Sequence, residues 1–413
     1  MQEIELIATA SFGLEAVVSR ELKQLGYDRQ KIEDGRITFT ADLQAICRTN
    51  LWLRSADRVL VKLGSFPARD FGELFDRTTA LPWSEWLPRD AAFPVRGKSV
   101  RSQLHSVPDC QSIVKKAVVE NMKKAHRTQW FEENGAPFSI EVSILKDQAT
   151  LTLDTTGPGL HKRGYRTSIG PAPIKETLAA ALVQLSFWNA QRPFLDPFCG
   201  SGTIPIEAAL WARNIAPGLK RSFDAEKWPK VPGGFWKEAR AEAADFAKRE
   251  IELELHGSDI DERALGMARK HAHDAGVGSE ILFEQRAFKD VSSHRKFGCV
   301  VCNPPYGERS GDVESAVKLA QEIGGHKAAN ELGIPKGTMY TWIKAFKEDR
   351  LSANEAVHTP KNALSLNDEL IELRKRVKEQ YKEIRRLKEE NEFLEKASAC
   401  FAASRRKSAK NRD

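Results

Sequence analysis

The sequence lacks the features that membrane-spanning and secreted proteins carry. No apolar stretch approaches the roughly 20 residues that a helix needs to cross a bilayer. Residues 1–5 do not form the basic region leading into an apolar one that begins a signal peptide. The 6 cysteines are scattered, which is typical of a reducing compartment and argues against a disulfide framework. We therefore expect a cytoplasmic protein without a membrane segment.

The sequence is long and mildly basic. With 413 residues, of which 41% are hydrophobic, it can bury more than one core, and we expect about two to four domains. The net charge is +7, and basic residues outnumber acidic ones from residue 313 onward. A basic end is compatible with nucleic-acid binding but does not demonstrate it.

The N-terminal part predicts two small α+β modules, residues 1–64 and 65–158. The first has a strand at 3–8, a helix at 12–22, a strand at 35–40 and a helix that starts at 42–50. The second has a helix at 110–125 and strands at 138–145 and 149–154. These modules indicate no function by themselves.

The segment that follows, residues 160–166, mixes cationic residues with an aromatic one. Cations contact phosphates and an aromatic ring stacks on an unpaired base, so RNA contact is one interpretation. A solvated linker explains the same composition equally well. The candidates for RNA contact are Lys162, Arg163, Tyr165 and Arg166.

A glycine-rich turn follows the predicted strand 193–195 and leads into a helix. Gly200 and Gly202 let the backbone approach a ligand that larger side chains would exclude. The turn is neither a P-loop nor the spaced three-glycine dinucleotide fingerprint. Asp196, at the strand end, is placed to hold an amino acid-like ammonium group, such as that of S-adenosyl-L-methionine. The turn ends at Thr203, where the helix starts.

Further along, an acid ends the next predicted strand, 252–261. Asp259 is placed there to bind two ribose hydroxyls, and a helix at 262–275 follows. Together with the glycine-rich turn, this predicts a pocket for a ligand that carries a nucleoside.

The third motif is Asn303-Pro304-Pro305-Tyr306, which follows the apolar run 297–302, a predicted buried strand. Two prolines fix φ and remove two backbone donors, and Asn303 before a proline favours an extended conformation. An exocyclic base amine could donate to the Asn303 side-chain oxygen and to the Pro304 carbonyl, while Tyr306 stacks on the base. The alternative is an ordinary proline turn. The Cys-x-x-Cys within the run lies in an apparent central strand and has no second pair elsewhere, which disfavours a zinc or redox role.

On these motifs, residues 1 to about 312 resemble the bacterial THUMP-domain class I RNA methyltransferases, most closely the large-subunit rRNA guanine-N2 methyltransferases. The resemblance implies an α/β protein with N-terminal ferredoxin-like and THUMP modules, and a Rossmann-like methyltransferase domain at 159–312. It implies RNA binding through the THUMP region and S-adenosyl-L-methionine as cofactor. The implied cofactor contacts are Asp196, Gly200, Gly202, Thr203 and Asp259, and the base-holding residues are Asn303, Pro304, Pro305 and Tyr306.

The sequence departs from that family in two places. The family usually has an acid for the adenine amine where Ala287 falls, and Asp290 is three residues late for that role. After Asp312 the expected further strands are missing, because residues 313–413 show no strand-like alternation. The sequence therefore predicts an incomplete sheet.

Residues 313–350 predict helices arranged as a helix-turn-helix. Residues 327–347 would bind double-stranded DNA, although a three-helix packing module without DNA binding is the alternative. Met339, Trp342, Ile343 and Phe346 are expected in the core. The candidates for DNA contact are Lys336, Thr338, Tyr340, Thr341 and Lys344.

Residues 351–365 predict a linker, 366–398 a coiled coil and 399–413 a basic disordered tail. Apolar residues repeat at 3-4 spacing from Leu370 to Leu394, and Asn391 within this seam favours a parallel homodimer, with a single solvated helix as the alternative. Residues 313 to about 410 resemble the small OrfA transposase subunit of IS3-type insertion sequences, without the acidic catalytic core of a transposase.

Three hypotheses follow from this join near residues 312–314. The chain is an active RNA methyltransferase with an added tail, a DNA-binding dimer with a passenger N-terminal part, or a fusion that performs neither function well. The missing strands favour a truncated methyltransferase of at most weak activity, and they predict local unfolding of residues 170–312.

Overall fold

The computed structural model describes residues 3–166, 174–248, 251–292, 295, 297–304, 317, 320–321, 324–331 and 336–347. The chain divides into two compact units, Met1–Pro305 and Tyr306–Asp413, and each is described by itself. No helix among these residues is long and apolar enough to cross a membrane. The predicted linker, coiled coil and tail at 351–413 lie outside the described residues, as do Pro305 and Tyr306.

The N-terminal part of the first unit is built on a seven-stranded sheet of order β2-β3-β1-β4-β7-β6-β5, in which β5 and β6 run parallel and the other neighbours are antiparallel. The strands are β1 Ile4–Ala10, β2 Gln30–Glu33, β3 Arg36–Ala41, β4 Ala56–Pro67, β5 Val95–Val100, β6 Ile140–Leu145 and β7 Gln148–Asp154. The helices of this part are α1 Glu15–Gln24, α2 Gln44–Trp52, α3 Phe71–Thr79 and α4 Val107–His126.

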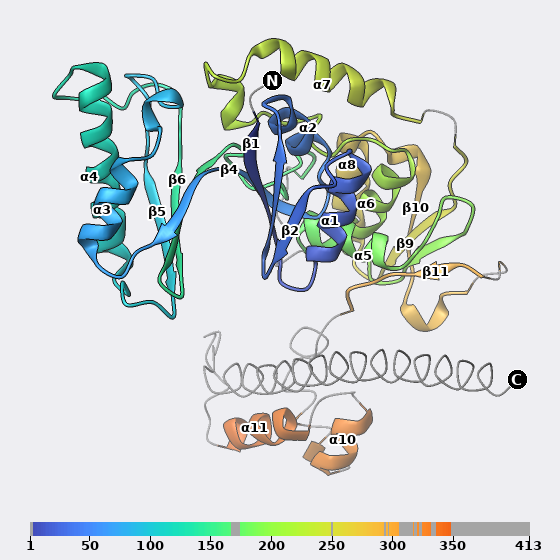
Figure 1. The fold of residues 1–413 in the computed structure, drawn as a ribbon. Helices are drawn as coiled ribbons and strands as arrows, with labels where there is room; N and C mark the ends of the chain where they lie inside the picture. Colours follow the sequence, from blue (N-terminus) through green and yellow to red (C-terminus); the bar gives the residue numbers. More distant parts are fainter. Residues whose placement is uncertain are drawn as a thin grey trace, which may run out of the picture. The chain divides into compact units, whose positions relative to one another are not determined.

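Strand β4 joins the two predicted modules. It pairs with β1 of the first module and with β7 of the second, and Figure 1 shows it running from one half of the sheet to the other. The boundary predicted after residue 64 therefore falls inside β4. The two modules share one continuous sheet and one hydrophobic core.

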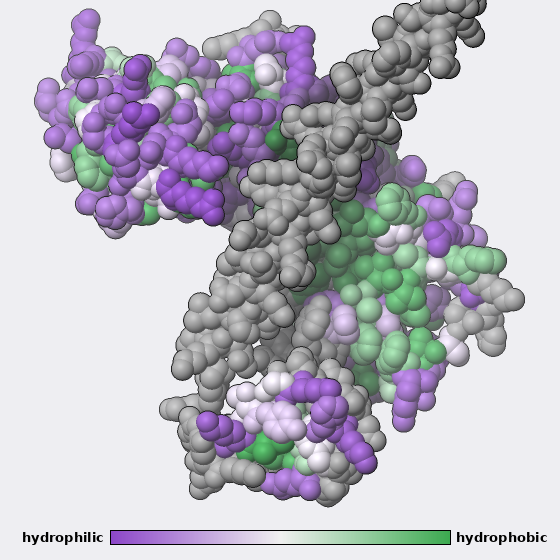
Figure 2. Space-filling model, turned by 60° about the horizontal axis from the view of Figure 1, so that its bottom comes forward, coloured by the Kyte–Doolittle hydropathy of each residue, from purple (hydrophilic) through white to green (hydrophobic). Residues whose placement is uncertain are grey.

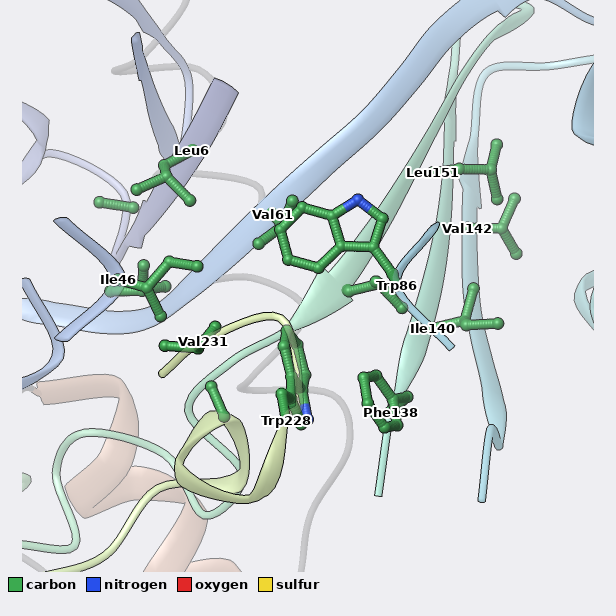
Figure 3. Close-up of a cluster of buried hydrophobic side chains, with 14 of the residues drawn as sticks. Leu6, Ile46, Val61, Trp86, Phe138, Ile140, Val142, Leu151, Trp228 and Val231 are labelled. Atoms are coloured by element: carbon green, nitrogen blue, oxygen red, sulfur yellow. The ribbon is translucent and has the colours of Figure 1, made fainter. Parts of the chain in front are cut away.

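Residues from much later in the chain complete this core. Figure 3 shows Trp228 beside Phe138 of the THUMP-like half, with ring centroids 4.6 Å apart in a stacked arrangement. Its indole N–H donates to the carbonyl of Pro137 at 2.9 Å. Helix α7 (Gly233–Asp245) packs on α2 directly afterwards. The insertion that carries Trp228 and α7 thus fixes the N-terminal modules to the domain that follows.

That domain contains a four-stranded parallel sheet of order β10-β9-β8-β11. Its strands are β8 Phe194–Asp196, β9 Leu255–Asp259, β10 Ile281–Gln285 and β11 Cys299–Val300. Its helices are α5 Glu176–Leu185, α6 Thr203–Ala212 and α8 Glu262–Ala275. The predicted helix 262–275 is confirmed, and α6 and α8 both contact the sheet.

Residues that lie side by side on adjacent strands point to the same face of this sheet, and their burial shows which face packs against helices. One row lies in or against the core that includes residues of α6 and α8: Ile281, Leu255, Phe194 and Cys299. The neighbouring row points the other way and is more exposed: Leu282, His256, Leu195 and Val300. Figure 2 shows hydrophobic side chains gathered on the surface of this domain.

The strand before Asn303, predicted to be buried and central, is only partly buried. Within the described sheet, β11 pairs only with β8 and stands at the edge. Val300 is 61% exposed and Phe297 is 86% exposed, whereas Val301 is buried. That the whole sheet is incomplete stays a prediction, because residues 305–316 lie outside the described residues.

The second unit contains two described helices, α10 Gly325–Glu331 and α11 Lys336–Lys347, which contact each other. Met339 and Ala328 are buried between them, and Trp342 and Ile343 pack against this small core, as expected from the sequence. Four of the candidate DNA-contact residues are exposed on α11: Lys336, Tyr340, Thr341 and Lys344. The side chains of Thr338 and Phe346 lie outside the description, and DNA binding stays a prediction.

Candidate functional site

The candidate site lies at one edge of the parallel sheet. Asp196 ends β8 and Asp259 ends β9, and in the parallel register Asp196 lies opposite Gly257. Asn303 follows β11, which pairs with β8 on its other side. The carboxyl ends of parallel strands meet at the same edge, and the strand order reverses between β8 and β11. Three motifs that are far apart in sequence therefore converge at a topological switch point.

The glycine-rich turn connects β8 to α6, and glycine is favoured at two of its positions for different physical reasons. Gly200 has φ +51° and Gly202 has φ +81°, in the left-handed region that glycine enters freely. A Cβ on Gly202 would lie 2.9 Å from the Cβ of Ala268 in α8, so this glycine allows close helix packing. A Cβ on Gly200 would meet no described atom within 4 Å. Gly200 is thus the position where a ligand has room to approach the backbone.

Asp196 is a buried carboxyl group beside this turn. Burial raises its pKa from 3.8 to about 7, the backbone N–H of Phe198 opposes that shift by donating to its Oδ1 at 3.1 Å, and the nearby charge of Asp259 adds to it. Among the described residues, no ion pair joins Asp196 to a cationic side chain. A buried carboxyl group of this kind gains from a cation, because a positive charge restores its ionised form.

Asp259 ties β9 to the turn. Its Oδ2 accepts a hydrogen bond from the backbone N–H of Gly200 at 2.9 Å, and its Oδ1 accepts one from the N–H of Asp261 at 3.0 Å. Asp261 in turn caps α8 by accepting from the N–H of Arg263. An ionised carboxylate has about four acceptor positions, so Asp259 keeps capacity for hydroxyl donors.

The residues that follow β11 approach this pair of acids. Cys302 is close enough for the charge of Asp196 to contribute, after burial, to raising the pKa of its thiol. Asn303 is exposed and Pro304 is half-buried, so the side-chain amide is accessible at the edge of the sheet. Their partners in the motif, Pro305 and Tyr306, lie outside the described residues.

The structure corrects the interpretation of the segment 160–166. Arg163 and Tyr165 are each only 3% exposed, and both donate to one oxygen of Glu207 in α6, at 3.4 Å and 3.0 Å. A buried guanidinium and a buried ring cannot contact RNA in this conformation. Lys162 is exposed, and Arg166 is half-buried and directed at α6, where it contacts Thr203. Thr203 is itself buried.

Two features of the site had no sequence prediction. The rings of Phe198 and Phe288 stack with centroids 5.0 Å apart, and they follow β8 and β10 at the same edge as the acids. His271 of α8 is buried, burial lowers its pKa, and its Nδ1 lies 3.2 Å from the carbonyl oxygen of Ser201 in the turn. Only tertiary contact identifies either feature, because each joins residues from different strands or helices. Asp290 is exposed in a short 3-10 helix, Phe288–Asp290, and Ala287 precedes it.

Comparisons with known proteins agree with this geometry. A family model described as "RMKL-like, methyltransferase domain" matches residues 163–339, which reaches beyond the predicted end at residue 312. Models of the RlmL ferredoxin-like domain and the THUMP domain match residues 5–60 and 68–154. The "Putative RNA methyltransferase YpsC" of Bacillus subtilis (strain 168) is 51% identical over 326 residues, 78% of this chain and 84% of that protein. The chain belongs to the RMKL-like methyltransferase family.

Two further relatives add detail on this methyltransferase family. The "Ribosomal RNA large subunit methyltransferase K/L" of Photobacterium profundum is 35% identical over 78% of this chain, which spans 46% of that protein. The crystal structure of "SMU.472, a putative methyltransferase complexed with SAH" is 44% identical with a TM-score of 0.72, and the match covers 80% of this chain and 88% of that one.

S-adenosyl-L-methionine is the cofactor of this methyltransferase domain. The residues at the sheet edge fit it. Asp196 is a buried acid that gains from an ammonium group, Gly200 leaves open space beside the backbone, and Asp259 retains acceptor positions. These three chemical properties match the amino acid and ribose parts of the cofactor.

Proposed function

We propose that this methyltransferase acts on RNA and transfers a methyl group to an exocyclic base amine, guanine N2 of large-subunit rRNA. The observation that carries the proposal is the convergence of Asp196, Gly200, Asp259 and Asn303 at one edge of the parallel sheet. An amide followed by proline suits a flat amine, because the side-chain oxygen and the next carbonyl offer two acceptors close together.

Each residue has a definite role in this proposal. When bound, S-adenosyl-L-methionine supplies an electrophilic methyl group. Asp196 holds the ammonium group, Gly200 admits the methionine part beside the backbone, and Asp259 accepts from the ribose hydroxyls. The Asn303 side-chain oxygen and the Pro304 carbonyl accept from the base amine and orient it. Holding two reactants in line is the main contribution of the protein, because positioning alone removes a large part of such a barrier.

The rest of the first unit would bind the RNA. The THUMP domain match at residues 68–154 and the names of the relatives support this part of the proposal. Among the residues of the segment 160–166, Lys162 remains a candidate for phosphate contact because it is exposed.

We also propose that turnover is slow. In the described residues, the strand that carries Asn303 has a neighbour on one side only, and Val300 on it is 61% exposed. A site held within a fraction of an ångström needs support from both sides of its strand. The proposed fusion to an insertion-element fragment would account for the lack of a second neighbour among the described residues.

Transfer of a labelled methyl group tests the function. Unmethylated large-subunit rRNA is incubated with labelled S-adenosyl-L-methionine and an excess of the full chain, and the label in the RNA is counted. The wild-type chain should label the RNA slowly, and Asn303→Ala should abolish labelling while binding of S-adenosyl-L-homocysteine stays intact. Equal labelling by the two chains would refute the role of Asn303, and label in duplex DNA alone would refute the RNA substrate.

A second proposal concerns the second unit, which we propose binds double-stranded DNA as part of a homodimer. The burial of Met339 together with the exposure of Lys336 and Tyr340 on the same helix supports it. Binding of the full chain to a DNA duplex should weaken steeply with salt, and Lys336→Ala should reduce the slope of log K against log salt by about 1. A slope that Lys336→Ala leaves unchanged would contradict a phosphate contact by this residue.

A further inference from the structure

The segment 160–166 covers one side of the helix that begins at the cofactor-binding turn. Thr203 and Glu207 of α6 are four residues apart, so they lie on the same side of the helix, one turn apart. Arg166 donates from Nη2 to the Thr203 hydroxyl oxygen, while Arg163 and Tyr165 donate to Glu207. The side chains that form these contacts are buried, except Arg166, which is half-buried.

The first of these contacts lies directly beside the turn. Thr203 is the first residue of α6 and follows Gly202, whose N–H donates to the carbonyl of Cys199 at 2.8 Å. The carbonyl of Gly202 accepts from the N–H of Ile206 at 3.0 Å. The turn and the first turn of the helix are thus one hydrogen-bonded unit, and a displacement of Thr203 moves the backbone at Gly200 with it.

We propose that Arg166 is a positioning residue for cofactor binding: it holds Thr203, and through Thr203 the glycine-rich turn, in the conformation that accepts S-adenosyl-L-methionine. This inference rests on the proposed function. It replaces the RNA contact that the sequence predicted for Arg166, because the side chain is directed at α6.

A guanidinium suits this position because it satisfies three partners at once. Besides Thr203, Arg166 donates to the carbonyl of Ile174 at 3.2 Å and forms an ion pair with Glu176 at 3.2 Å between Nη1 and Oε1. Glu176, in the first turn of α5, is only 2% exposed. Arg166 therefore ties the start of α5 to the start of α6. A lysine has one point of charge and cannot reach these partners in the same geometry.

The segment also connects the turn to the N-terminal modules. The guanidinium of Arg163 donates to the carbonyl of Arg54, which follows α2, and to the carbonyl of Leu160 at 2.9 Å. The backbone N–H of Arg54 donates to Glu21 of α1 at 2.9 Å. The docking of the RNA-binding part and the geometry of α6 are thus linked by buried polar contacts. Breaking one of them costs much free energy, because the remaining donor or acceptor stays buried without a partner.

A pair of near-isosteric substitutions tests the contact. Thr203→Val removes the hydroxyl and keeps the shape, while Thr203→Ser keeps the hydroxyl. Calorimetric titration of the full chain with S-adenosyl-L-homocysteine should show affinity about tenfold weaker for T203V, as expected for one lost charge-assisted hydrogen bond, and within about twofold of wild type for T203S. The matched control is Thr49→Val, a buried threonine of α2 whose hydroxyl donates to the carbonyl of Ala45. T49V should lower the melting temperature and leave the affinity unchanged.

A double-mutant cycle separates positioning by Arg166 from direct contact by Thr203. Arg166→Met is made together with Glu176→Gln, so that no carboxylate stays buried without its partner. If Arg166 acts through Thr203, adding T203V to this pair weakens binding no further than the larger single effect. Additive losses would overturn the inference.

The remaining outcomes distinguish the inference from the proposed function. A wild-type chain that binds no S-adenosyl-L-homocysteine would refute the proposed function together with this inference. A wild-type chain that binds, with T203V and the R166M/E176Q pair binding equally well, would refute only the inference. Loss of rRNA retention on filters by R166M/E176Q with unchanged cofactor affinity would restore the RNA-contact interpretation of Arg166.

Discussion

The buried carboxyl group of Asp196 predicts an unusual dependence of stability and binding on pH. Burial raises its pKa in the folded chain from 3.8 to about 7, so between these values the folded chain holds a proton that the unfolded chain has released. The contribution of Asp196 to the free energy of unfolding therefore falls as pH rises through this window. From below pH 4 to well above pH 7, a pKa difference of this size corresponds to a total loss of about 4 kcal/mol.

Asp196→Asn removes the titrating group and keeps the shape. The asparagine oxygen can still accept from the N–H of Phe198, which donates to Asp196 at 3.1 Å. Urea unfolding of the ligand-free chain, followed by tryptophan fluorescence, should therefore show D196N more stable than wild type above pH 7, and by about 4 kcal/mol at most. The difference should vanish near pH 4. Asp28→Asn, at an exposed carboxylate, is the matched control and should follow wild type throughout.

The same titration of Asp196 should also affect cofactor binding, but here the rise in pH strengthens the interaction. An ammonium group binds the ionised carboxylate, so the affinity for S-adenosyl-L-homocysteine should rise between pH 5.5 and pH 7, and one proton should be released per molecule bound at the lower end. Calorimetry in buffers of different ionisation enthalpy measures that proton. D196N should bind weakly at every pH and release no proton. Parallel stability curves for D196N and wild type, or binding without proton release at pH 5.5, would refute the reasoning.

Three further predictions concern the folded chain. Gly202→Ala should lower the free energy of unfolding by about 3 kcal/mol in urea unfolding, because φ is +81° and the new Cβ meets Ala268. Gly200→Ala should lower it by only about 1 kcal/mol, because its Cβ meets no described atom. Equal losses for the two variants would contradict the packing role of Gly202. Val300→Lys at the β11 edge should reduce aggregation beyond the proposed homodimer in light scattering, since a charge on an edge strand opposes strand pairing. Unchanged aggregation would contradict a role of this edge in it. Trp228→Ala should destabilise the first unit by about 4 kcal/mol in the same urea assay, through the lost stack on Phe138, and a loss below about 1 kcal/mol would contradict its place in the shared core.

Local motifs allowed much of the site to be predicted. Asp196, the two glycines and Asp259 were identified because a strand end, a tight turn and a helix start occupy consecutive residues, and the structure brings them together. The structure adds the distinction between Gly200, which faces open space, and Gly202, which faces Ala268. That distinction depends on a helix more than 60 residues away, and no local pattern contains it.

Other expectations failed because they depend on distant partners. The cationic and aromatic character of Arg163 and Tyr165 suggested RNA, but their partner Glu207 lies in α6, on the far side of the glycine-rich turn. The sharing of β4 between two modules was not predicted. Its pairing with β1 and with β7 involves distant strands, and the sequence around residue 64 carries no local signal for it. The apolar run before Asn303 has the composition of a central strand, whereas its place at the edge of the described sheet depends on the strands that flank it there.

The central claim is that the residues at the carboxyl ends of β8 and β9 form a working cofactor site although β11 ends the described sheet. Calorimetric titration of the full chain with S-adenosyl-L-homocysteine at pH 7.5 tests it most directly. We predict saturable binding of one molecule per chain with a micromolar dissociation constant, lost in Asp259→Ala. The absence of saturable heat from a folded wild-type chain, or equal binding by Asp259→Ala, would contradict the claim.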